Sequence, residues 1–277
     1  MGLSKVCRTF SSSHSSLLTQ DQVIVVGAGP SGLLLTVLLA RAGISVTLLE
    51  AAAELDVSPR AAHYAPPAAF ELSRAGVLDD VVAEGFKPDR AAWRKADGSF
   101  IAGCSLGGVL GDYPYRMVVL PLDKLDKLLY KHAQKYENAE VLFEHKVLDV
   151  GSDDNGAWVE VDTSSGKKRL QADYVVGTDG ATSTVRRCMF GEGSFAGETL
   201  DAQIIASNVY YDFMGKHDYW DTNFIVCCPN NTIHLAARLT DFLGRQEELV
   251  YGSKDYKRWS IQSELFRNSR SESPGLC

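Results

Sequence analysis

The chain has 277 residues, of which 45% are hydrophobic and 23% charged, and its formal net charge is −7. This composition is typical of a globular protein with one large domain or two modest ones. The acidic balance argues against a nucleic-acid partner, and no apolar run reaches the roughly 20 residues that a membrane-spanning helix needs. Six irregularly spaced cysteines without a C-x-x-C pair favour reduced thiols in the cytoplasm.

The first 20 residues are rich in serine, contain Lys5 and Arg8, and lack Asp and Glu. We expect a disordered N-terminal extension. The composition also resembles a transit peptide weakly, so a mitochondrial location is the alternative to the cytoplasm.

A strand, a turn, a helix and a second strand follow this extension. The β-branched run Gln22–Val26 predicts a buried strand, and Ile44–Leu49 predicts another. Between them, Gly27–Gly32 predicts a tight turn and Leu33–Ala42 a helix that Gly43 ends. The pattern predicts a βαβ unit with parallel strands.

The turn of this unit carries the spacing G-x-G-x-x-G, with Ala28 inside it. In such a fingerprint Gly27 makes the tight turn, Gly29 lets the backbone approach a diphosphate, and Gly32 lets the helix pack against the strand. The diphosphate then lies at the positive end of the helix. Glu50 ends the second strand 18 residues after Gly32, where a carboxylate binds ribose hydroxyls. The spacing predicts a dinucleotide site but does not separate FAD from NAD.

Beyond a loop at residues 51–64, the elements are mixed. Helices are predicted at Pro66–Arg74, Val77–Ala83 and Pro121–Ala133, and strand character at Trp93–Ala102, before a glycine-rich loop at 103–114. A three-stranded meander is predicted at Val141–Val150, Ala157–Thr163 and Lys168–Ala172. The strand Tyr174–Val176 then leads into Asp179 and Gly180.

The character of the sequence changes near residue 190. Strands of a separate sheet are predicted at Ile204–Tyr211, Asn223–Cys227 and Thr232–Arg238, and residues 244–277 predict a poorly ordered tail. We therefore divide the chain into an extension (1–20), a cofactor domain (21–190, with 90–115 contributing to a substrate domain), a partial substrate-binding sheet (191–243) and the tail.

Four segments resemble the FAD-dependent aromatic hydroxylases, the group A flavoprotein monooxygenases typified by p-hydroxybenzoate hydroxylase and phenol hydroxylase. They are VIVVGAGPSGLLLTVLLARAGISVTLLE, SPRAAHYAPPAAFELSRAGVLDDV, LPLDKLDKLLYKHA and ADYVVGTDGATSTVRR, in the order of that family and within about residues 21–190. The resemblance implies an α/β fold: a Rossmann-like FAD-binding domain with a β-meander, plus part of an α+β substrate domain.

The resemblance also implies roles for single residues. Asp179 and Gly180 match the D-G motif near the FAD and the path of the pyridine nucleotide, although an Asp-Gly turn ending a strand would look the same. Arg60 matches an arginine that contacts cofactor phosphate or NAD(P)H, and Arg116 is a candidate FAD contact. These four residues join the fingerprint and Glu50 as the predicted cofactor site.

The implied reaction uses NAD(P)H to reduce FAD, and oxygen then forms a flavin C4a-hydroperoxide that hydroxylates an aromatic or enolic small molecule. No metal is required, and the sequence identifies neither a catalytic side chain nor the oligomeric state. Tyr210, Tyr211, Tyr219 and Trp220 either line the substrate pocket or belong to the core. The resemblance suggests secondary metabolism or aromatic degradation as the setting.

Two departures from the family leave alternatives open. Leu122 stands where the family commonly has a polar residue, and no segment matches the later G-D-A-A-H-x-x-x-P motif, whose aspartate binds the ribityl chain. The first alternative is therefore a truncated, non-catalytic nucleotide-binding remnant. The second is an NAD-linked oxidoreductase, which the Asp179 segment and Arg60 argue against.

Overall fold

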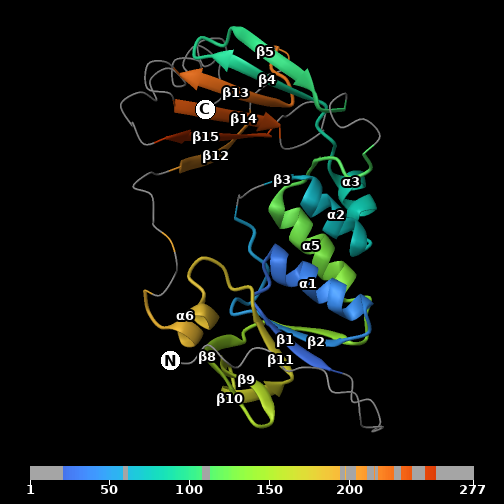
Figure 1. The fold of residues 1–277 in the computed structure, drawn as a ribbon, viewed down its shortest axis with the longest axis vertical. Helices are drawn as coiled ribbons and strands as arrows, with labels where there is room; N and C mark the ends of the chain where they lie inside the picture. The colour runs from blue at the N-terminus through green and yellow to red at the C-terminus, as the bar shows by residue number, and fades with distance from the viewer. Residues whose placement is uncertain are drawn as a thin grey trace, which may run out of the picture.

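The computed structural model describes residues 21–58, 62–107, 113–193, 197, 204–210, 215, 218–227, 232–238 and 247–253, with the backbone alone at 204–210, 226–227, 232–238 and 247–253. A parallel sheet lies between a layer of helices and a small meander, and a larger mixed sheet lies beyond the helices (Figure 1). Among the described helices, none has both the length and the apolar content that crossing a membrane requires.

The parallel sheet has four strands in the order β11-β1-β2-β7. They span Gln22–Val26 (β1), Ser45–Leu49 (β2), Ala139–Leu142 (β7) and Tyr174–Gly177 (β11), and every neighbouring pair is parallel. The predicted βαβ unit forms its centre. β1 and β2 therefore end at the same edge, where ligands bind in open α/β sheets.

Both faces of β1 are buried, which explains its unbroken apolar run. Val23 and Val25 pack into the cluster that contains the helices, whereas Ile24 and Val26 pack into the cluster on the meander side. All four side chains are less than 7% exposed. Because side chains alternate along a strand, one short segment joins two cores.

A layer of helices lies on one side of this sheet. Helix α1 (Pro30–Arg41) packs directly on β1, β2 and β7, and α5 (Leu122–Ala133) packs against α1. Helices α2 (Pro66–Arg74) and α3 (Leu78–Glu84) pack against each other, and α3 also packs against α5. The predicted start of the first helix at Leu33 was late, because Pro30 begins it. Proline suits this position, where its missing N–H would have no helical partner. Gly43 follows the helix with φ +83°, as predicted for its end.

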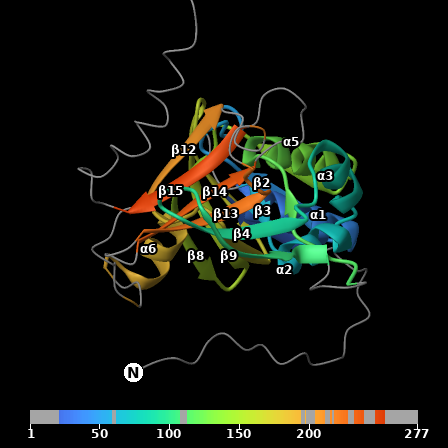
Figure 2. The ribbon, with the colours of Figure 1, turned by 90° about the horizontal axis from the view of Figure 1, so that it is seen from above.

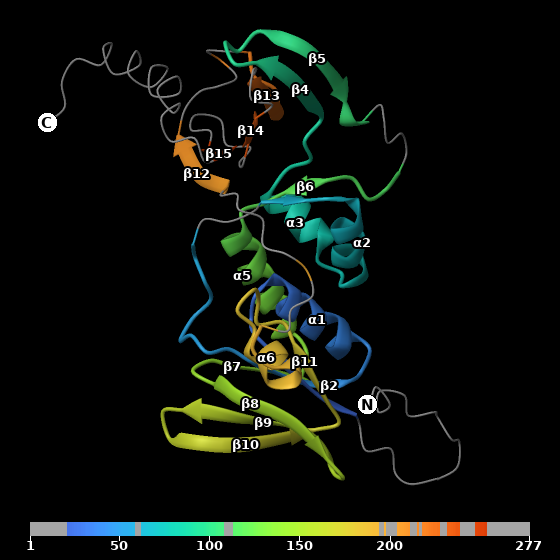
Figure 3. The ribbon, with the colours of Figure 1, turned by 60° about the vertical axis from the view of Figure 1, so that its left-hand side comes forward.

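The other face is covered by the antiparallel strands Lys146–Asp153 (β8), Gly156–Thr163 (β9) and Gly166–Ala172 (β10) (Figure 3). The predicted single strand Val141–Val150 was wrong, because it is divided between β7 and β8. Glu144 has φ 56°, and its N–H bonds to the Ala52 carbonyl at 3.0 Å. This left-handed residue turns the chain from the parallel sheet into the meander.

The larger sheet has six strands in the order β12-β15-β14-β13-β4-β5 and lies above the helices in Figure 1, so its strands are toward the viewer in Figure 2. Its strands are Arg90–Lys95 (β4), Phe100–Ser105 (β5), Ile204–Tyr210 (β12), Thr222–Cys227 (β13), Thr232–Arg238 (β14) and Glu247–Ser253 (β15). The segment with predicted strand character, Trp93–Ala102, and the strands predicted after residue 190 thus share one sheet.

The structure differs from two predictions for this region, in each case at a few residues. Residues 103–105 belong to β5 rather than to a loop, because they pair with residues 90–92 of β4. Gly103 suits this strand because a Cβ there would lie 2.4 Å from the Trp220 ring. Residues 247–253 form a strand in the segment predicted to be poorly ordered. β15 pairs with both β12 and β14, so backbone hydrogen bonds on two edges outweigh its weak apolar pattern.

Short elements connect the layers. The two-residue strands His63–Tyr64 (β3) and Val118–Val119 (β6) pair between the helices and the six-stranded sheet, so residues 63 and 64 are not loop as predicted. Helix α6 (Thr184–Phe190) follows β11 and packs against β8.

Candidate functional site

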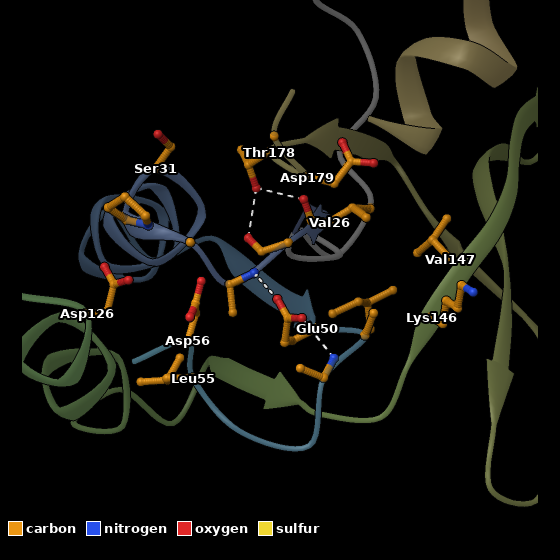
Figure 4. A pocket seen from close by; sticks show the side chains of 18 of the residues that line it. Val26, Ser31, Glu50, Leu55, Asp56, Asp126, Lys146, Val147, Thr178 and Asp179 are labelled. Carbon is orange, nitrogen blue, oxygen red and sulfur yellow. Dashed lines mark hydrogen bonds between the residues drawn. The ribbon is translucent and has the colours of Figure 1, made fainter. Parts of the chain in front are cut away.

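A cavity of about 750 Å³ opens at the carboxyl ends of β1, β2 and β11 (Figure 4). Its walls are the glycine turn at 26–31, the loop after β2, the first turns of α5, the turn before β8 and the segment after β11. Segments far apart in the sequence meet here because parallel strands end at one edge. Of the predicted site residues, the cavity unites Gly27, Ala28, Gly29, Glu50, Asp179 and Gly180.

The three fingerprint glycines have different surroundings. Gly27 has φ +102°, and a Cβ on it would lie 2.8 Å from the Asp179 Cα. A Cβ on Gly32 would lie 2.0 Å from the Gly27 carbonyl oxygen, whereas a Cβ on Gly29 would meet nothing within 4 Å. Gly27 and Gly32 are therefore required by the fold itself. The space above Gly29 leaves the backbone accessible, and its use by a diphosphate stays a prediction.

The N-terminus of α1 faces this space. Gly29 is its N-cap, no side chain caps the helix, and its first turn holds no acidic residue. The first N–H groups of a helix lack intrahelical partners, and the helix dipole adds partial positive charge there. This donor set fits the diphosphate of a dinucleotide.

Glu50 joins two turns at the edge of the sheet. Its Oε2 accepts a hydrogen bond from the Ala28 N–H at 2.8 Å, and its Oε1 accepts one from the Ala52 N–H at 2.8 Å (Figure 4). A carboxylate offers about four acceptor positions, so two remain for the hydroxyls of a ribose. The backbone N–H of His145 also donates to the Glu50 carbonyl at 2.8 Å, which holds this residue in place.

Thr178, which the sequence did not single out, fastens the glycine turn to β11. Its Oγ1 lies 2.8 Å from the Val26 carbonyl oxygen and 3.0 Å from that of Gly27, and both carbonyls are acceptors for its hydroxyl. The signal for it was its place directly before the Asp-Gly pair.

Asp179 lines the cavity, yet its carboxylate bonds to the start of α6. Oδ2 accepts from the N–H of Thr184 at 2.6 Å and from that of Val185 at 3.2 Å, and Oδ1 accepts from the Ser183 hydroxyl at 2.6 Å. Three bonds to one helix start give Asp179 a structural role. Gly180 has φ +80° and nothing within 4 Å of a Cβ, so it keeps this wall of the cavity open.

Of the two predicted arginines, the structure describes only Arg116. Arg60 lies outside the described residues. Arg116 lies at the junction with the six-stranded sheet, where its Nη2 is 3.4 Å from the Pro88 carbonyl oxygen and 3.5 Å from Asp89 Oδ1. It is absent from the cavity walls that the structure describes.

Four aromatic residues were predicted either to line the substrate pocket or to belong to the core, and the structure describes the side chains of two of them. Tyr219 is 7% exposed and lies under the guanidinium of Arg94, 4.8 Å from the ring centre. Trp220 stacks under Arg90 at 4.9 Å. Both belong to the packing of the six-stranded sheet. Tyr211 lies outside the described residues, as does the side chain of Tyr210.

His63 is a half-buried histidine in the short strand β3, between the helices and the six-stranded sheet. Its Nε2 is buried and has no hydrogen-bond partner among the described residues. Burial lowers the pKa of its imidazole from 6.5 to about 4, since an apolar surrounding disfavours the charged form. The ring is therefore neutral at pH 7.

The parallel sheet, the glycine turn and the acidic residue after β2 together define a dinucleotide-binding domain of the Rossmann-like class. The family model of the FAD binding domain matches residues 20–246, and the chain belongs to this family. Its cofactor is thus FAD, as the resemblance implied, and the fold class predicted from the sequence is confirmed.

Two curated relatives illustrate the family. Para-nitrophenol 4-monooxygenase of Pseudomonas sp. (strain WBC-3) is 39% identical over 211 residues, which cover 75% of this chain and 51% of the relative. 6-Hydroxy-3-succinoylpyridine 3-monooxygenase HspB of Pseudomonas putida is 36% identical over 196 residues, or 70% of this chain and 49% of the relative. The chain spans about half the length of these relatives.

Solved structures agree. The p-nitrophenol 4-monooxygenase PnpA of Pseudomonas putida superposes with a TM-score of 0.77 at 32% identity, covering 89% of this chain and 61% of PnpA. Aklavinone-11 hydroxylase, solved with FAD and aklavinone, gives a TM-score of 0.67 at 23% identity over 89% of this chain and 47% of its own. The second likeness shows the fold alone.

Proposed function

We propose that the chain binds FAD in the cavity at the edge of the parallel sheet and acts in an FAD-dependent monooxygenase that hydroxylates a small aromatic molecule. The observation that carries this proposal is the joint placement of the α1 N-terminus, the open Gly29 and the Glu50 carboxylate around one cavity. The names of the relatives support the reaction class.

Each group has a defined task in this proposal. The N–H groups at the start of α1 hold the diphosphate, and Glu50 accepts hydrogen bonds from the ribose of the adenosine half. Asp179 holds α6 and, through the turn at Gly180, shapes the opposite wall. When bound, the flavin takes a hydride from NAD(P)H and activates oxygen. NAD(P)H, oxygen and the aromatic compound are then the partners of the chain.

The names of the two curated relatives described above support a substrate class. One is named for a nitrophenol and the other for a hydroxypyridine, so we propose a ring that carries a hydroxyl group. Its binding region involves the six-stranded sheet, and we place the domain boundary near residue 190, with β4 and β5 on the substrate side. We propose a cytoplasmic location on the cysteine pattern.

A titration of the purified full chain tests the proposal. We expect FAD to bind with a change in its visible spectrum and quenching of its fluorescence. We then expect NADPH or NADH to bleach the flavin bands, faster with p-nitrophenol as the probe substrate. A chain that stays colourless after incubation with FAD would refute the proposal.

Gly29→Ala is the matched variant for this titration. A methyl group at Gly29 meets no protein atom within 4 Å, so the fold stays intact while the approach of the diphosphate is blocked. We expect a native circular dichroism spectrum together with loss of FAD binding. If Gly29→Ala binds FAD as the wild type does, the diphosphate does not lie at this turn.

A further inference from the structure

The first turns of α5 form one wall of the cavity. On this wall Leu122 stands at the position where the family commonly has a polar residue. Leu122 and Asp126 are four residues apart, so they lie on one face of the helix, and both line the cavity. Leucine offers no hydrogen bond. Asp126 is only 4% exposed and is the acidic residue that α5 presents to the cavity.

Asp126 and Glu50 occupy different parts of the cavity. Figure 4 shows Lys146 and Val147 at one end, Asp126 beside the start of α1 at the other, and Glu50 between them. Glu50 thus lies nearer to the meander than Asp126 does. Asp126 lies on the helix side of the sheet, where α5 packs on α1. The α1 N-terminus faces the cavity next to Asp126.

The covalent order of FAD assigns these two carboxylates. Its diphosphate separates the ribose of adenosine on one side from the ribityl chain of the flavin on the other. With the diphosphate at the α1 N-terminus and the ribose at Glu50, the ribityl chain extends toward Asp126. We propose that the Asp126 carboxylate accepts a hydrogen bond from a ribityl hydroxyl and supplies the polar contact that Leu122 cannot make. This inference rests on the proposed function.

The surroundings of Asp126 suit an acceptor of hydroxyl protons. The positive end of α1 offsets its charge near a diphosphate. Tyr64 is a neighbour: burial, then the charges of Asp126 and Asp123, raise the pKa of its phenol, which therefore stays protonated. Its Oη is buried and has no hydrogen-bond partner among the described residues. A carboxylate beside a protonated phenol fits a polyol, which both donates and accepts hydrogen bonds.

Affinities of the full chain for FAD and for ADP test the assignment, because ADP keeps the adenosine and diphosphate but lacks the ribityl chain. For Asp126→Ala we expect FAD to bind about tenfold to a hundredfold more weakly, the range for a hydrogen bond to a charged group, and ADP to bind within about twofold of the wild type. Asp126→Asn keeps an acceptor oxygen and should recover part of the loss. Isothermal titration gives both constants without measuring turnover.

The matched control is Asp123→Asn, one turn earlier on the same helix. Asp123 pairs with Lys127 at 3.3 Å and does not line the cavity, so both affinities should stay unchanged. FAD analogues that each lack one ribityl hydroxyl complete the test. One of them should bind wild type and Asp126→Ala equally well, because the contact is already lost.

The outcomes separate the two proposals. If the wild-type chain binds FAD and Asp126→Ala binds it equally tightly, only the assignment of Asp126 is overturned, and the proposed function stands. Equal losses for FAD and ADP in folded Asp126→Ala also overturn it, since they place Asp126 at the diphosphate. Wild-type chain that binds ADP but not FAD overturns the proposed function and this assignment together.

Discussion

The Glu50 carboxylate bridges the glycine turn and the loop after β2, with one oxygen 2.8 Å from the Ala28 nitrogen and the other 2.8 Å from the Ala52 nitrogen. A residue predicted for ligand binding thus also fixes the shape of the turn that faces the ligand. This arrangement holds both acceptor oxygens in place before a cofactor arrives, which lowers the entropy cost of binding.

Glu50→Ala should therefore weaken FAD binding more than a lost ribose contact alone explains. We expect a loss of about tenfold to a hundredfold in affinity, because the variant removes a charged acceptor and releases two backbone donors. Glu50→Gln keeps one acceptor oxygen and should fall between. Fluorescence titration measures both. Glu140→Gln, at the exposed residue of β7, is the control, and equal affinities for all four proteins would contradict the role of Glu50.

The glycines of the turn should separate folding from binding. For Gly32→Ala we expect unfolding at lower urea concentration, with about 1–3 kcal/mol of stability lost, because its methyl group would lie 2.0 Å from the Gly27 carbonyl oxygen. Gly29→Ala should unfold within about 1 kcal/mol of the wild type, since nothing lies near its methyl group. The reverse order of the two midpoints would show that the turn is packed differently.

His63 should make the fold sensitive to acid. Its pKa of about 4 in the folded chain lies below the ordinary value of 6.5, so the unfolded chain binds a proton first as the pH falls. Stability from this residue is complete above pH 6.5 and is lost progressively toward pH 4. The loss approaches about 3 kcal/mol, from 1.36 kcal/mol for each pH unit.

His63→Phe keeps a ring of similar bulk and removes the titration. The free energy of unfolding, measured by urea between about pH 7.5 and pH 4.5, should fall less steeply for the variant than for the wild type. Parallel curves would show that His63 is solvated in the folded chain.

Arg94 should stabilise the six-stranded sheet. It is 4% exposed, and its Nε and Nη1 donate to Asn223 Oδ1 and to the Gly98 carbonyl, each at 3.1 Å, while Nη2 donates to the Asp218 carbonyl. Arg94→Met removes the hydrogen bonds to these three acceptors together with a buried charged donor, and should cost about 2–4 kcal/mol. Arg94→Lys should recover little, because an ammonium group cannot match the planar fork. A change below about 0.5 kcal/mol in urea unfolding would contradict this role.

Local patterns were sufficient for much of the parallel half of the fold. The run Gln22–Val26, the glycine spacing and Glu50 predicted β1, the turn and the carboxylate, because burial on both faces and a tight turn leave direct marks in a sequence. No local sequence pattern indicates the break between β7 and β8. Glu144 is not a residue that signals a turn, and its left-handed backbone is held by the Ala52 carbonyl from elsewhere in the chain.

The sequence by itself determined the βαβ unit, the dinucleotide cofactor and the residues at one edge of the sheet, because these depend on spacing along a continuous segment. Only the tertiary structure decided what each side chain does there. It engaged Asp179 with α6, moved Arg116 away from the cavity and brought Asp126 to its wall. These outcomes depend on how α5, α6 and the six-stranded sheet pack. Local periodicity predicts single elements but not the packing between segments that are distant in the sequence.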